Sequence, residues 1–149
     1  MTQLNDVNAI GPKLKVLNTL VEKELNNTLA TMTPALTGTQ VAVLMTLADE
    51  SVTTVTQKQM EGILHLSHPT TRGVIKRLVS MQLIATSKLV TDQRQVVLAL
   101  TSNGRQFISE NRAQINQSTN KVERKLVGTL SDEAQRQFLT TLATMIRQF

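Results

Sequence analysis

SHPTTRGVIKRLVS, residues 67–80, is the stretch that decides the fold. At 100° per residue, one side of a helix gathers Thr71, Val74, Ile75, Leu78 and Val79. The opposite side carries Thr70, Arg72, Gly73, Lys76, Arg77 and Ser80. Ser67 can accept a hydrogen bond from the first free N–H groups, and Pro69 comes early enough for its missing N–H to cost little. The stretch predicts a helix that is held in a core on one side and presents three cations to an anionic partner on the other.

The net charge of the chain is concentrated around this helix. The formal charge is +5, and residues 65–105 hold six Lys and Arg residues against Asp92 alone. The remaining residues hold ten cations and ten anions, so they contribute no net charge. A basic region this localised favours nucleic acid as the partner, and a merely solvated basic face is the alternative.

The composition excludes several classes of protein. The 149 residues suit one domain, or one domain with a helical extension, and 40% of them are hydrophobic. The absence of cysteine excludes disulfides, thiolate metal sites and thiol redox switching. No apolar run approaches the roughly 20 residues that span a bilayer, and the N-terminus lacks the pattern of a secretory signal. We therefore expect a soluble cytoplasmic protein with no membrane segment.

The residues before the quoted helix predict three helices and a short strand. After a break at Gly11-Pro12, a first helix should run to Thr33, and Ile10 joins it if the helix crosses Gly11. Its apolar stripe comprises Leu14, Leu17, Leu20, Val21, Leu25 and Leu29. Thr37 can cap a second helix that ends near Asp49.

A helix-turn-helix is expected next. Residues 52–55 are β-branched enough for a small strand, and Thr56 then caps a third helix through Leu64 with Met60, Ile63 and Leu64 facing inward. Residues 65–67 form the turn into the quoted helix, which should extend from about residue 68 to 82.

A β-hairpin follows at once. Residues 83–90 and 95–100 are β-prone, and the polar residues 91–94 form a tip between them. A helix-turn-helix with such a hairpin is a winged helix.

The C-terminal third predicts two helices. Thr101 caps a long helix to about Gly128, whose narrow seam of Ile108, Ile115 and Val122 favours helix-on-helix packing. Ser131 caps the last helix, whose apolar face comprises Phe138, Leu139, Leu142, Ala143, Met145, Ile146 and Phe149. Such a face is a liability in a monomer, so we expect a symmetric homodimer to bury it, in addition to packing on the first helix within one chain.

The predicted fold class is mainly α with a small β-hairpin wing: a winged helix-turn-helix flanked by N- and C-terminal dimerisation helices. Residues 1–149 form a single chain. Within it, we expect residues 35–100 to form a DNA-binding lobe, and residues 10–33 and 101–149 to form a helical dimerisation lobe.

The chain resembles the MarR family of bacterial winged-helix transcriptional regulators over nearly its whole length. The resemblance is carried by Thr56-Gln57, residues 67–72, Lys76-Arg77-Leu78, Leu83-Ile84, Asp92-Gln93-Arg94 and Leu100-Thr101-Ser102-Asn103-Gly104. It implies a homodimer formed by the terminal helices, a pseudo-palindromic operator, and release from DNA by a small anionic or lipophilic aromatic effector. The lack of cysteine excludes the thiol-oxidation sensing of one family branch, and the lack of Tyr and Trp disfavours a strongly aromatic pocket.

Several residues are candidates for DNA contacts. Thr70, Thr71 and Arg72 lie near the start of the helix, where base edges come within reach, and Arg72 is suited to bidentate contact with guanine. Pro69 or a Thr methyl group could meet a thymine methyl, and His68 is a helix-start residue or a contact to the DNA backbone. Lys76 and Arg77 suit phosphates. The remaining candidates are Lys88 in the basic region, Arg94 for the minor groove, and Thr37 and Thr39 for phosphates.

The role of Asp92 has two interpretations. The resemblance favours an ion pair that orients Arg94, and an ordinary turn pair is the alternative.

The sequence predicts a sequence-specific DNA-binding transcriptional regulator, expected to be a repressor, without cofactor or metal. The alternative is a protein-interaction module that uses the winged helix without reading DNA. An enzyme is disfavoured, because His65, His68 and Glu61 have no evident further ligand to complete a metal set and no nucleophile motif or phosphate loop appears.

Overall fold

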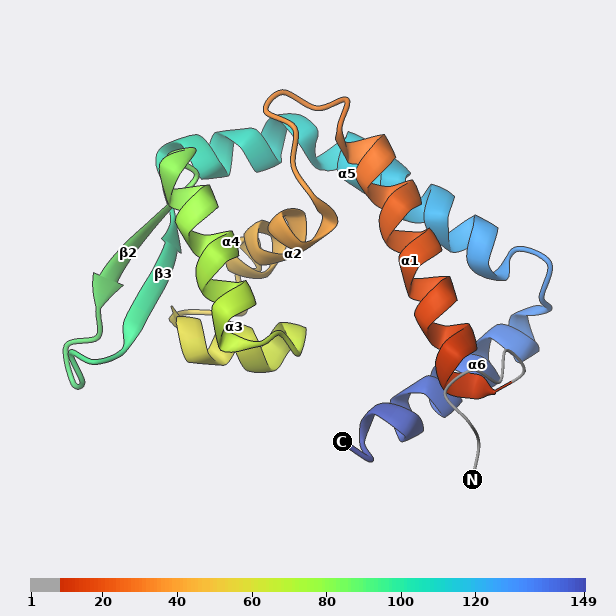
Figure 1. Ribbon diagram of the computed structural model, residues 1–149. Coiled ribbons are helices and arrows are strands. Elements are labelled where there is room, and N and C mark those ends of the chain that lie inside the picture. Colours follow the sequence, from red (N-terminus) through yellow and green to blue (C-terminus); the bar gives the residue numbers. More distant parts are fainter. Residues whose placement is uncertain (1–8) are drawn as a thin grey trace.

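The computed structural model describes residues 9–149, which form six helices and a three-stranded antiparallel sheet. The elements are α1 (Ile10–Leu29), α2 (Gly38–Ala48), β1 (Val55–Thr56), α3 (Gln57–Leu64), α4 (His68–Ser80), β2 (Ile84–Lys88), β3 (Val96–Leu100), α5 (Ser102–Val127) and α6 (Asp132–Ile146). In Figure 1, α2 to β3 make one compact lobe, and α5 runs from that lobe to α1 and α6. The predicted winged-helix architecture is confirmed.

The sheet forms the wing. Its strand order is β1-β3-β2, so β3 lies in the centre and pairs antiparallel with both neighbours. Val55 pairs with Leu98, and Ile84 pairs with Leu100. The β2–β3 hairpin projects away from the helices, which places its tip at the edge of the lobe (Figure 1).

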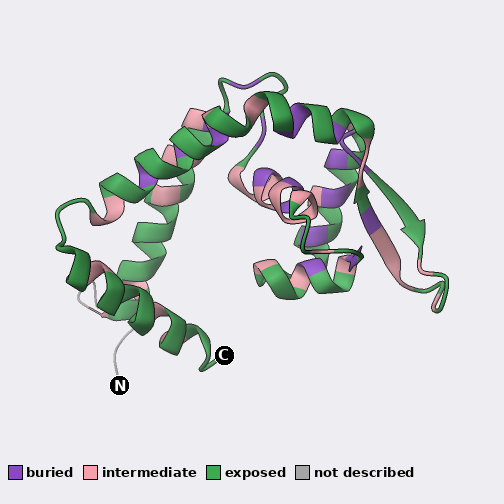
Figure 2. Ribbon diagram, turned by 180° about the vertical axis from the view of Figure 1, so that it is seen from behind, coloured by how far each residue is buried: buried purple, intermediate pink, exposed green. Residues whose placement is uncertain are grey.

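The hydrophobic core lies mainly inside the lobe and continues along α5. Leu44, Met60, Leu78 and Ile84 are almost completely buried. Figure 2 shows buried residues recurring along the helices and strands of the lobe and along α5. Leu, Val, Ile and Met supply most of this core, as the shortage of aromatic residues required.

The helix starts follow the predicted capping residues. Thr37 and Thr56 each form a capping box with the Gln three residues later, which satisfies two free backbone N–H groups reciprocally. Ser67, Thr101 and Ser131 accept hydrogen bonds from the backbone N–H groups of Thr70, Gly104 and Ala134. Local hydrogen-bonding chemistry therefore places every one of these helix starts where the sequence indicated.

The bounds of several elements differ from expectation, and β2 covers Ile84–Lys88 rather than residues 83–90. α1 begins at Ile10 and runs through Gly11 and Pro12, because a proline in the first turn removes only an N–H that has no intrahelical partner. It ends at Leu29 rather than Thr33. β1 is limited to Val55–Thr56, since only those residues pair with β3. α4 ends at Ser80, before Gln82 adopts a positive φ of 60°.

Two apolar residues expected to face inward do not. Ile63 is 50% exposed and Val79 is 39% exposed. Each lies at the margin of its helix's apolar stripe, so the neighbouring residues Met60 and Leu78 take the buried positions.

The terminal helices pack differently from the lobe. The seam of Ile108, Ile115 and Val122 is buried, and α5 lies along α1. Gln114 Nε2 of α5 donates to Thr31 Oγ1, just after the end of α1, at 2.9 Å. α6, by contrast, has no buried residue. No helix among residues 9–149 is both long enough and apolar enough to cross a membrane.

Candidate nucleic-acid interface

The first turn of α4 is held in place by local hydrogen bonds. Ser67 Oγ accepts from the Thr70 N–H at 3.3 Å and its hydroxyl lies 2.8 Å from Thr70 Oγ1. Ile75 and Leu78 anchor the opposite side of the helix in the core. Arg72, Lys76 and Arg77 are consequently left on the exposed side, as predicted.

Thr71 does not belong to that exposed side, and its assignment as a DNA contact is corrected. Its side chain is completely buried, and its hydroxyl donates to the Ser67 carbonyl at 2.9 Å. The helical periodicity had already placed Thr71 with Val74 and Ile75. Its role is to secure the first turn of α4 against the core.

The structure brings Arg72 and Arg94 to one groove. This hollow of about 450 Å³ lies between α3, the start of α4 and the wing. Its lining residues are Gln57, Lys58, Glu61, His68, Arg72, Arg94, Gln95 and Val96. Lys58 of α3, Arg72 of α4 and Arg94 of the wing tip therefore face the same space, which favours an anionic polymer as its occupant.

A hydrogen-bonded group crosses this groove from α3 to α4. His68 Nδ1 lies 2.6 Å from Glu61 Oε1, and Gln57 Nε2 lies 3.5 Å from the same nitrogen. Gln57, Lys58 and Gln95 were not among the predicted contacts, and Glu61 had no predicted partner. Gln57 and Glu61 are four residues apart, so the sequence places them on the same face of α3, and this spacing could have identified them as a polar pair. The partner on α4 is visible only in three dimensions.

At the wing tip, Asp92 organises Arg94 in two ways. Asp92 Oδ1 accepts from the Arg94 backbone N–H at 3.1 Å and lies 3.7 Å from Arg94 Nε. The turn pair and the ion pair therefore coexist. The Arg94 side chain is 95% exposed, so it is free to reach outward. Lys88 is exposed at the end of β2, beside the tip.

Thr37 and Thr39 lie apart from the groove. They line a separate hollow of about 220 Å³ with Leu64 at the end of α3 and Leu66 of the following turn. The Thr37 hydroxyl accepts the Gln40 N–H at 3.3 Å and so serves as the α2 cap. Lys76 and Arg77 do not line the Arg72 groove either, and they extend the positive surface farther along α4.

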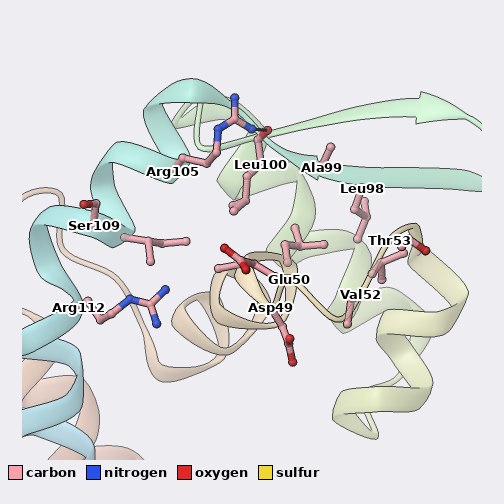
Figure 3. A pocket seen from close by; sticks show the side chains of 14 residues that line it. Asp49, Glu50, Val52, Thr53, Leu98, Ala99, Leu100, Arg105, Ser109 and Arg112 are labelled. Atoms are coloured by element: carbon pink, nitrogen blue, oxygen red, sulfur yellow. Dashed lines mark hydrogen bonds between the residues drawn. The ribbon is translucent and has the colours of Figure 1, made fainter.

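A further hollow of about 460 Å³ separates the lobe from the first half of α5. Figure 3 shows Arg105, Ser109 and Arg112 along the α5 side and Asp49 and Glu50 after α2. Ser51 donates to Asp49 Oδ1 through its hydroxyl at 2.7 Å and its N–H at 3.0 Å, which lowers the pKa of the Asp49 carboxyl. The walls of the hollow include apolar side chains, so it combines both charge signs with hydrophobic surface.

Comparison with known proteins identifies the family. A model for the transcriptional regulator family SarA/Rot matches residues 29–111, which span α2 to β3 and the start of α5. The chain belongs to the SarA/Rot family of transcriptional regulators. This is a family of regulators rather than of enzymes. No curated protein sequence matches significantly.

Solved structures with the same fold span almost the entire length of this SarA/Rot family member. BpsR of Bordetella bronchiseptica, described as regulated in DNA binding by 6-hydroxynicotinic acid, is 24% identical, with 97% of each chain covered and a TM-score of 0.77. S. aureus MepR, in complex with DNA, is 19% identical, covers 95% of this chain and 98% of its own, and has a TM-score of 0.78. The E. coli MarR C80S mutant with operator DNA is 19% identical, covers 99% and 98%, and has a TM-score of 0.74. The MarR-type fold is confirmed.

Proposed function

We propose that this regulator binds a pseudo-palindromic operator as a homodimer, with α4 of each subunit in a major groove and each wing over the adjacent minor groove. The observation that carries the proposal is the convergence of Lys58, Arg72 and Arg94 on one groove. A winged helix presents its second helix and its hairpin to the same stretch of duplex. Cations on α4 and on the wing are therefore placed to contact the same segment of duplex DNA.

Each exposed residue of this surface has a distinct role. Arg72 contacts a guanine edge, and Thr70 or Pro69 meets a thymine methyl group. Lys76 and Arg77 hold phosphates, as do Thr37 and Thr39 beside the turn. Lys88 adds positive charge to the wing and so attracts the DNA backbone. Arg94, oriented by Asp92, enters the minor groove. Buried Thr71 takes no direct part.

The homodimer forms through the terminal helices. Apolar side chains of α1, α5 and α6 line an open hollow of about 530 Å³ on this side of the chain. Leu139 and Ile146 of α6 are 62% and 56% exposed. A second copy that packs α1 and α6 against the same elements buries this surface on both subunits at once, which is how an isologous interface works. The described apolar face thus supports a two-fold dimer.

We infer that a small effector controls release from DNA and that the protein acts as a repressor. DNA binding by BpsR, which shares the fold, is regulated by 6-hydroxynicotinic acid. In this chain, the hollow beside Arg105 and Arg112 suits a small aromatic or lipophilic effector, because the apolar side chains of Leu98 and Ile108 lie among charged groups of both signs that can orient it. A ligand there wedges between α5 and the lobe and alters the spacing of the two α4 helices.

Fluorescence anisotropy at several salt concentrations tests the proposal. The probes are the duplex upstream of the protein's own gene and a scrambled duplex of equal composition. Preferential binding to the upstream duplex, with affinity falling steeply as salt rises, supports a sequence-specific regulator. Equal binding to both duplexes points to an operator elsewhere. Binding to neither would favour the protein-interaction module, for which losing the charges of Arg72, Lys76 and Arg77 should not matter.

A further inference from the structure

The pair of His68 and Glu61 occupies the point where the proposed DNA contacts meet. The Glu61 side chain is only 19% exposed, whereas the His68 side chain is 65% exposed. Glu61 is therefore largely enclosed and holds Nδ1 of the imidazole at 2.6 Å. Because His68 is the first residue of α4, the free edge of the ring stands beside the N-terminal turn, where phosphate is favoured.

The charges around His68 come from three elements. Lys58 and Glu61 face it from α3, Arg72 from α4, and Arg94 from the wing, where Asp92 is paired with Arg94. The positive end of the α4 dipole adds to the positive charge of this surface. Among the described residues that line the groove, Glu61 is the sole carboxylate. Glu61 is thus the negative group that the His68 ring meets in this groove, and an entering anion would be a second one.

We propose that Glu61 is a positioning residue that makes the DNA contact of His68 a protonated one, so that DNA binding takes up a proton. This rests on the proposed function. When Nδ1–H donates to Glu61 in the neutral ring, Nε2 has a lone pair and cannot donate to a phosphate oxygen. A proton from solvent on Nε2 turns that nitrogen into a donor. The imidazolium then lies between two anions, the Glu61 carboxylate and the phosphate.

Removing one partner or the other should change DNA binding in opposite directions, each at a different pH. In Glu61→Gln the amide oxygen still accepts from Nδ1, but the negative charge next to the phosphate is gone. This variant should bind DNA at least as tightly as the wild type near pH 8. In His68→Gln the carboxylate stays uncompensated, so binding near pH 5 should be weaker than for the wild type. A purely structural role of Glu61 would instead weaken binding equally at every pH.

The test measures binding of a random-sequence DNA duplex at fixed ionic strength from about pH 5 to about pH 8, the range in which histidine changes charge. A random-sequence duplex serves because phosphate contacts do not depend on sequence. The wild-type Kd should rise with pH by at most about tenfold per unit for each proton taken up. Calorimetry in two buffers of different ionisation enthalpy counts those protons directly. Thermal unfolding verifies that each variant is folded.

His65→Asn is the matched control. It removes the neighbouring imidazole outside the groove, and asparagine tolerates the left-handed backbone of that position, where φ is 51°. Its pH profile should follow the wild type, whereas His68→Gln and Glu61→Gln should be flatter and take up fewer protons. Parallel profiles for wild type and His68→Gln, or uniform weakening in Glu61→Gln, would overturn this inference but leave the proposed function standing. Absence of DNA binding at every pH would overturn the proposed function with it.

Discussion

The lobe of α2 to β3 and the terminal helix α6 are built from similar residues but are buried very differently. In the lobe, Met60 and Leu78 are completely buried between helices and sheet. In α6, Leu139 and Ile146 are mostly exposed, although that helix has an apolar face as well developed as those of the lobe. Figure 2 shows this contrast along the chain, with buried residues in the lobe and on α5 and none on α6.

The difference shows that a single chain buries the apolar side chains of the lobe but leaves the apolar face of α6 exposed. The lobe encloses its apolar side chains with its own elements, so its surface can be given over to charged contacts. The terminal helices leave an apolar surface that a soluble monomer rarely tolerates. The SarA/Rot model covers residues 29–111, which include the whole lobe from α2 to β3 and the first turns of α5.

Truncation after Leu130 should have the largest effect, and that effect is on the oligomeric state. It deletes α6 and the apolar face that a partner would cover, so sedimentation should show monomers or aggregates. In the full-length chain, Leu139→Glu should weaken the dimer by about 2 kcal/mol or more, as expected for an interface anchor. Lobe secondary structure, followed by circular dichroism, should persist in Leu139→Glu. A soluble, well-behaved dimer of the truncated chain would contradict the dimer interface.

Gly104→Ala tests how the lobe is joined to α5. A Cβ at this position would clash with the Leu83 carbonyl oxygen, a backbone atom that cannot move independently. Urea unfolding should show a loss of about 1–3 kcal/mol, the usual range for overpacking. The control is Gly73→Ala on α4, where a Cβ meets nothing within 4 Å and helix propensity predicts a gain of up to about 1 kcal/mol. Equal stability of the two variants would refute the tight junction.

Arg72→Ala tests whether the exposed side of α4 reads DNA bases. Loss of a bidentate guanine contact costs about 1–3 kcal/mol of discrimination, so operator affinity should fall about 5- to 150-fold. Binding of random duplex should fall much less. Arg124→Ala, an exposed cation near the end of α5, is the control in the helical region and should leave both affinities unchanged. Equal losses on operator and random duplex would remove Arg72 from base reading.

Arg94→Ala should have a smaller effect that is confined to the wing. Its side chain is 95% exposed, so thermal unfolding should not change. Operator affinity should weaken, and the slope of log K against log salt should decrease by about one charge. Anisotropy titrations at several salt concentrations measure both quantities. Unchanged affinity would take the wing out of the proposed interface.

Glu24→Gln should have the smallest effect, and it acts between the terminal helices. A hydrogen bond from Lys125 at 2.7 Å, with Lys121 nearby, lowers the pKa of Glu24 below its usual 4.5. A carboxyl whose pKa is lower in the folded state stabilises the fold above its ordinary pKa and loses that contribution as pH falls through the lowered value. Wild type and variant should therefore differ slightly in thermal unfolding at neutral pH and converge well below pH 4.5. A constant difference across this range would rule out the ion pair as its source.

The sequence anticipated features that depend on neighbours along the chain. Capping by Thr37, Thr56 and Ser67 needs only a hydroxyl next to free N–H groups, and the exposed face with Arg72 needs only helical periodicity. The concentration of charge in residues 65–105 indicated an anionic partner for the same reason, since charge can be counted without a structure.

Features that depend on distant segments were decided by the tertiary structure. Packing of α4 against the core buried Thr71 and removed it from the contact surface. The docking of α3 beside α4 paired Glu61 with His68, and the placement of the hairpin brought Arg94 into the groove of Arg72. Periodicity fixes which side of one helix a residue occupies, but the relative placement of two elements depends on the whole core. The sequence by itself therefore determined the elements and the charged face, and only the folded chain determined which side chains meet there.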